Sequence, residues 1–99
     1  MARLIFRTEA KLEFFEAVAR YEGEEPGLGR EFAKEVVHAL GRARRQPELY
    51  RRVRGRARKT RVKRFKAYNI YFAIKEDAFS IISIFHSSRN PRELQRRLR

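Results

Sequence analysis

Ten lysine and arginine residues stand among the sixteen consecutive positions 51–66, and no acidic residue interrupts them. Arginine recurs at every second position over 52–58, and basic residues do so again over 59–63. A period of two is that of a β-strand, whose side chains alternate between the two faces of a sheet. Closely spaced cations attract phosphate groups and carboxylates. The segment therefore predicts a basic strand that meets a polyanion.

The net charge of the whole chain supports this interpretation. The formal net charge is +13, and the second half of the chain carries all of it. Residues 1–50 hold nine basic and nine acidic residues, whereas residues 51–99 hold sixteen basic and three acidic ones. Such asymmetry predicts an acidic partner, which is nucleic acid, an acidic protein segment or an anionic surface. The alternative is a solvated basic face without a partner.

Residues in and after the basic segment could act in ribonuclease chemistry. That reaction needs a base near a ribose 2′-hydroxyl, an acid near the leaving oxygen and cations for the developing phosphate charge. The candidates for these roles are Arg61, Lys63, Tyr71, His86 and Arg89. The signal has low specificity, because a segment this rich in arginine supplies any required cation by chance.

Each of the two later candidates also has a structural interpretation. His86 would be a strand-end histidine bonded to the backbone, and Arg89, just before Asn90 and Pro91, would brace the chain end. Residues 87–99 contain neither tyrosine nor histidine. The catalytic interpretation therefore depends on His86 and cations.

Several function classes are excluded by composition. The chain has no cysteine, and its two histidines lie far apart without an acidic cluster, so we expect neither a metal site nor a cofactor. The N-terminal residues lack the pattern of a signal peptide. No apolar run approaches the roughly 18 residues of a membrane span. We therefore expect a cytoplasmic protein that has no contact with a membrane.

The elements that position these residues follow from hydrophobic periodicity. Apolar spacings of three and four predict two helices joined by a short turn, the first capped by Thr8 and ending near Gly23, the second ended by Pro47. Gly55 indicates a turn, and 51–56 a loop or sheet edge. The remaining predicted elements are strands over 3–7, 57–65, 67–75 and 78–86, a hairpin turn at 76–77, and a last helical segment over 93–99.

The order β-α-α-β-β-β predicts an α+β fold, built as a single domain over residues 1–99. A helical hairpin would pack on one face of a small, antiparallel-rich sheet, and a short C-terminal helix would follow. The other face of the sheet would be partly exposed, and we expect the basic strand there.

Local motifs point to a known family. They are Tyr21 at the end of the first helix, Pro26-Gly-Leu-Gly29 at the start of the second, Gln46-Pro47 at its end, Arg61-Val-Lys-Arg-Phe65 before Tyr68-Asn-Ile-Tyr71, and His86-Ser-Ser-Arg89-Asn-Pro91. In this order they resemble the RelE/ParE superfamily of toxins from bacterial type II toxin–antitoxin systems. The last motif is similar to the ParE-like branch.

The resemblance implies a small plasmid-stabilisation type of toxin that a cognate antitoxin holds inactive, in a heterodimer or a larger assembly. ParE-like toxins inhibit growth by binding DNA gyrase, whereas RelE-like toxins cleave mRNA on the ribosome, so the resemblance leaves open whether the chain is an enzyme. The residues expected to bind the antitoxin or the target are Arg58, Arg61, Lys63, Arg64 and Arg89. A non-toxic nucleic-acid-binding module is a third hypothesis.

Overall fold

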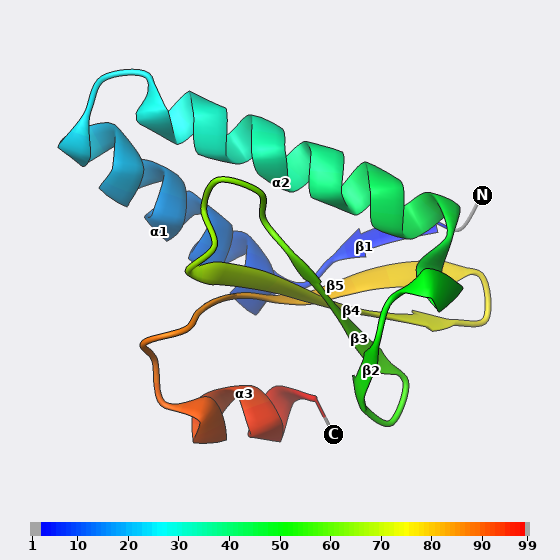
Figure 1. Cartoon of the computed structure of the whole chain (residues 1–99). Coiled ribbons are helices and arrows are strands. Elements are labelled where there is room, and N and C mark those ends of the chain that lie inside the picture. Colours follow the sequence, from blue (N-terminus) through cyan, green and yellow to red (C-terminus); the bar gives the residue numbers. More distant parts are fainter. Residues whose placement is uncertain (1–2, 99) are drawn as a thin grey trace.

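A five-stranded sheet with a helical layer on each face organises residues 3–98, which are the part of the chain that the computed structural model describes (Figure 1). The predicted α+β fold is confirmed. No helix within this part is long and apolar enough to cross a membrane. The elements in chain order are β1 (Arg3–Phe6), α1 (Thr8–Glu24), α2 (Leu28–Arg45), the short 3-10 helix η1 (Pro47–Leu49), β2 (Arg52–Arg54), β3 (Ala57–Arg61), β4 (Tyr68–Lys75), β5 (Ala78–His86) and α3 (Pro91–Arg97).

The sheet has the strand order β1-β5-β4-β3-β2. The last four strands pair antiparallel in sequence order, and the predicted turn at 76–77 joins β4 to β5. β1 instead pairs parallel with β5, so that Arg3 lies opposite Ala78 and Phe6 opposite Ile81. β1 is shorter than β5, and the edge of β5 beyond Ile81 therefore has no neighbouring strand.

The helical hairpin of α1 and α2 covers one face of the sheet. The two helices approach closely at Gly29, where an added Cβ would lie 2.6 Å from the Val18 carbonyl oxygen. The Glu22 carboxylate accepts hydrogen bonds from the backbone N–H groups of Gly27 and Gly29, at 3.0 and 3.1 Å. Phe32 lies fully buried beneath the hairpin, within an aromatic cluster that seals this face of the sheet.

The short helix α3 covers part of the opposite face, so that face is less open than the sequence predicted. Leu94 and Leu98 pack there in a second buried cluster with Ala57, Tyr71, Ile82 and Phe85. The Asn90 side chain caps the helix by accepting a hydrogen bond from Arg92 N at 3.0 Å, which places its start before the predicted residue Glu93. The predicted end at Arg99 lies outside the described residues.

The basic segment departs from its prediction in one important respect. β3 ends at Arg61, so Lys63 and Arg64 lie in a loop and the predicted strand over 57–65 is wrong beyond its fifth residue. The reason is that Val62 and Phe65, three positions apart, both turn into the core under the hairpin. Arg64 between them takes a left-handed φ of 71°. The alternation of basic residues continues to Lys63, whereas the strand ends at Arg61, so the basic residues alone do not indicate where the strand stops.

The other expectations for this region are closer to the structure. The predicted edge at 51–56 contains the short strand β2, and the turn to β3 is made at Gly55, whose φ is +52°. Thr8 is the first residue of α1 rather than its cap; Arg7 precedes the helix and makes no side-chain capping bond. The helix ends are otherwise within about two residues of those predicted.

Candidate functional site

The predicted binding cations of β3 face opposite sides of the sheet. Arg58 lies on the hairpin side, where its Nη1 atom donates a hydrogen bond to the Tyr50 carbonyl oxygen at 2.7 Å. Arg61 is three positions further along the strand, so its side chain lies on the α3 side, where it is exposed. A flat ligand therefore cannot contact both guanidinium groups at once.

The two loop cations also differ from each other. Lys63 is exposed and has no hydrogen bond or ion pair to any described residue. Arg64 forms an ion pair with Glu31 of α2 at 2.9 Å, and its guanidinium carbon lies 5.4 Å from the centre of the Phe65 ring. Arg64 thus ties the loop to the hairpin, and Lys63 is the freer of the two to meet a partner.

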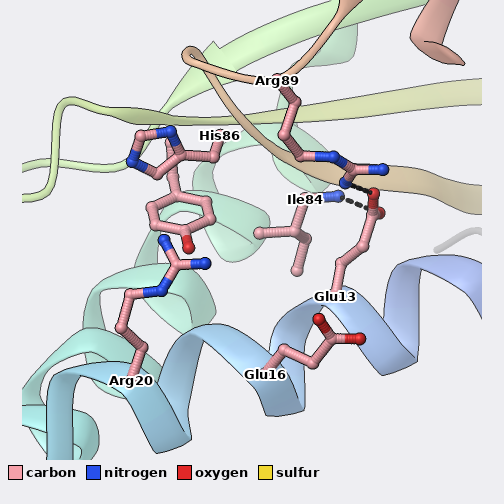
Figure 2. Close-up of a pocket in the computed structure, with 7 residues that line it drawn as sticks. Glu13, Glu16, Arg20, Ile84, His86 and Arg89 are labelled. Carbon is pink, nitrogen blue, oxygen red and sulfur yellow. Dashed lines mark hydrogen bonds and ion pairs between the residues drawn. The ribbon is translucent and has the colours of Figure 1, made fainter.

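A cleft opens between α1 and the unpaired end of β5, and we name it the α1–β5 cleft (Figure 2). Its volume is about 230 Å³. The cleft brings together two of the predicted site residues, His86 and Arg89, with residues that the sequence had not indicated. The lining residues are Glu13, Glu16, Arg20, Tyr68, Ile84, His86 and Arg89.

His86 is held at the mouth of this cleft by its own loop. Its Nδ1 atom accepts a hydrogen bond from Ser88 N at 3.0 Å and lies 2.8 Å from Ser88 Oγ. The ring also packs edge-on against Tyr68, with ring centres 4.9 Å apart. An Nδ1 atom that accepts from a backbone N–H carries a lone pair, so the neutral ring bears its proton on Nε2. In this arrangement the Nδ1 lone pair of His86 is already occupied.

Tyr68, which lines the cleft, and Tyr71, a predicted site residue, both carry a phenol that can donate a hydrogen bond. Burial raises the pKa of both the Tyr68 and the Tyr71 phenol above the ordinary value, so each stays protonated near neutral pH. Tyr71, moreover, is only 8% exposed and lies beneath α3, on the opposite face of the sheet from His86. The structure therefore does not bring Tyr71 and His86 together.

Glu13 forms the most strongly bonded group in the cleft. It lies beside the edge of β5 that β1 leaves open, where its Oε1 atom accepts hydrogen bonds from Ile84 N at 3.1 Å and Ser83 Oγ at 2.9 Å. Arg97 of α3 reaches the same edge; its Nη1 atom lies 2.8 Å from Glu13 Oε2, and its Nη2 atom donates to the Ile82 carbonyl oxygen. These side chains take the place of a neighbouring strand.

Arg89 completes this ion-pair cluster. Its guanidinium contacts Glu13 (Figure 2), pairs with Glu93 at 2.7 Å and lies 4.5 Å from the centre of the Phe85 ring. Burial alone would raise the pKa of Glu13, but hydrogen bonds from Arg97 and Arg89 outweigh it and hold that pKa below its ordinary value. Arg89 therefore braces α3, as its structural interpretation predicted, and has little capacity left for a substrate.

The cleft is lined by hydrogen-bond donors and acceptors together. Arg20 and Tyr68 can donate hydrogen bonds and Glu16 can accept them, while Glu13 and Arg89 neutralise each other. Within residues 3–98 no group of three histidine, cysteine or acidic side chains could hold a metal ion.

Comparison with known proteins identifies the family. A family model described as the ParE toxin of the type II toxin–antitoxin system parDE matches residues 4–91. The chain belongs to the ParE toxin family. Sequence comparison with curated proteins gave no match. Among solved structures, this ParE-family chain is similar to one from the chromosomal ParDE TA system of P. aeruginosa, with a TM-score of 0.75 and 14% identity, over 87% of this chain and 96% of that chain. At this identity the similarity shows a shared fold alone.

The ParE-family fold explains why the sequence did not indicate several residues in and beside the α1–β5 cleft. Glu13 and Arg97 stand 84 positions apart and meet only because β5 lies between α1 and α3. One signal was present, because Glu13 adjoins the apolar stripe of α1, where an acidic side chain needs a partner. Arg20 and Tyr68 gave no such signal.

Proposed function

We propose that this ParE-family chain is the toxin component of a type II toxin–antitoxin pair. It inhibits growth by binding a cytoplasmic target such as DNA gyrase, and a cognate antitoxin neutralises it by forming a heterodimer or a larger assembly. Family membership supports the toxin role. The net charge of +13 supports acidic partners.

One observation favours binding over catalysis. The candidate ribonuclease residues are not assembled, since Tyr71 is buried beneath α3, Arg89 is engaged by Glu13 and Glu93, and the basic nitrogen of His86 is occupied by Ser88. A general base must be within hydrogen-bond reach of the proton that it removes. Inhibition by surface contact needs no such group.

A gyrase supercoiling assay with the purified protein tests this proposal. We expect inhibition at micromolar protein and loss of inhibition when Arg61 and Lys63, both exposed and unpaired among the described residues, are changed to glutamate. The same double variant is expected to weaken antitoxin binding. Adding Arg58→Glu should deepen both losses, but Arg58 bonds Tyr50, so a thermal melt must show that this triple variant folds.

The matched control is Arg30→Glu with Lys34→Glu on the exposed side of α2, which changes the net charge by the same amount. We expect it to inhibit gyrase as the parent does. No inhibition by the parent protein at micromolar concentration would remove gyrase as the target. Equal loss in both double variants would mean that only total charge matters.

The second candidate is a RelE-like, ribosome-dependent mRNA endonuclease, favoured by the shared cleft of His86, Tyr68 and Arg20. Primer extension on mRNA from expressing cells decides between the two. Codon-linked cleavage that His86→Gln abolishes would establish the endonuclease, and its absence would exclude it. Growth that is unaffected by expression would instead favour the non-toxic nucleic-acid-binding module.

A further inference from the structure

A second cleft lies on the α3 side of the sheet, beyond the C-terminal end of that helix, and we name it the α3-face cleft. In Figure 1 the turn between β2 and β3 descends beside this end of α3, and α3 does not extend beneath the part of the sheet that leads to the turn between β4 and β5. The cleft has a volume of about 290 Å³. Its floor crosses three strands and is formed by Ala57, Ala73 and Ile82, with Leu98 of the chain end beside them.

The described rim of this cleft is positively charged. Among residues 3–98, four basic side chains and no acidic side chain line it. Arg97 is neutralised by Glu13. The other three, Arg7, Arg56 and Lys75, are exposed and make no hydrogen bond or ion pair through their side chains with any of residues 3–98. Three unneutralised cations around an apolar floor complement a ligand that carries carboxylates on either side of an aliphatic group.

The shape of the cleft favours a peptide over nucleic acid. No aromatic side chain of the described residues lines it, so a base has no ring on which to stack, and Tyr71 of the same face is covered by α3. The cleft is at the lower end of the roughly 300–1,000 Å³ of small-molecule sites, which suits one or two side chains rather than a cofactor. Alanine and isoleucine on its floor suit an aliphatic side chain.

We propose that the α3-face cleft binds an acidic peptide segment of the neutralising partner. One aliphatic side chain of the segment lies on Ala73 and Ile82, and flanking carboxylates pair with Arg7, Arg56 and Lys75. The identity of the partner rests on the proposed function, whereas the chemistry of the cleft does not. The proposal adds a contact for the acidic partner away from residues 58–64, at the turn between β2 and β3 and the end of β4.

The test is an NMR titration of the full chain with a six-residue peptide amide that has two leucines between two pairs of glutamates. We expect the largest amide shifts at Ala57, Ala73 and Ile82. Arg56→Glu with Lys75→Glu should weaken binding about tenfold, since two exposed ion pairs are lost and replaced by repulsion. Ala73→Trp, which fills the floor without changing charge, should also abolish these shifts.

The control is again Arg30→Glu with Lys34→Glu, on the far side of the hairpin, for which we expect less than a threefold change. Shifts centred elsewhere, or an equal loss of affinity in the control, would overturn the proposal. So would a single-stranded RNA oligomer that displaces the peptide from these three residues. If the protein arrests growth but does not bind the peptide, only the proposal for the α3-face cleft is refuted. If it binds the peptide without arresting growth, only the proposed toxin role is refuted.

Discussion

Replacing Glu13 by glutamine removes the charge that holds both α3 and the open edge of β5. The side chains of Glu13 and Arg97 are 11% and 14% exposed, whereas that of Arg89 is 36% exposed. Truncating one partner of a fully buried pair costs about 3–5 kcal/mol. Arg89 is partly exposed, and the side-chain oxygen of the new glutamine can still accept a hydrogen bond from Ile84 N. We therefore expect the free energy of unfolding to fall by about 2–3 kcal/mol.

Urea unfolding followed by circular dichroism at pH 7 measures this loss. A decrease of about 2–3 kcal/mol in the free energy of unfolding should also lower the melting temperature by roughly 8–24 °C in a domain of this size. The matched control is Glu16→Gln, one turn away in the same cleft, where the carboxylate has no ion pair within residues 3–98. We expect it to change stability by less than about 0.5 kcal/mol.

The dependence on pH provides a second readout. The pKa of Glu13 is depressed in the folded chain, so its contribution is present above the ordinary value of 4.5 and is lost as the pH falls through the lower, folded-state value. The stability difference between the parent and Glu13→Gln should therefore shrink as the solution is acidified below that ordinary value. If the two variants Glu13→Gln and Glu16→Gln were equally stable, or if the difference did not change with pH, the assignment of Glu13 would be wrong.

Two further predictions concern the two helical layers. Gly29→Ala places a Cβ against the Val18 carbonyl oxygen and should destabilise the chain by about 1–3 kcal/mol. The control Gly41→Ala, whose Cβ meets nothing within 4 Å, should be neutral or slightly stabilising, and a lower melting temperature in both variants would contradict the close approach at Gly29. Leu94→Ala should loosen α3 and speed tryptic cleavage near the chain end more than Gln95→Ala, which removes only an exposed hydrogen bond from Arg54. Equal cleavage rates would mean that the leucine does not anchor the helix.

The sequence predicted the elements of this fold better than it predicted their partners. Strands β4 and β5 were found almost to the residue, because continuous apolar runs bounded by turn residues indicate buried strands. The end of β3 was missed, because Val62 and Phe65 enter the core at a spacing that no strand has. The parallel pairing of β1 could not be deduced from local pattern, since it depends on which edge remains free when the sheet assembles.

The candidate site was less predictable than the fold for the same reason. Periodicity located the cations but not their faces, so Arg58 and Arg61 were grouped although the sheet separates them. The sequence left Tyr71 as a catalytic candidate, but in the structure α3 covers it. Both outcomes depend on contacts between residues distant in the chain, which a single sequence does not encode in any local signal.

The bonding of the open β5 edge has a consequence for how the chain folds. The contacts that close this edge join Glu13 to residues as far as 84 positions away, and β1 likewise pairs with a strand near the other end of the chain. Loops this long must be closed against their entropy, which makes such contacts slow to form. Until they form, the backbone of β5 remains a bare strand edge that another chain could pair with. The kinetic hazard in folding is thus concentrated at the edge that Glu13 and Arg97 close.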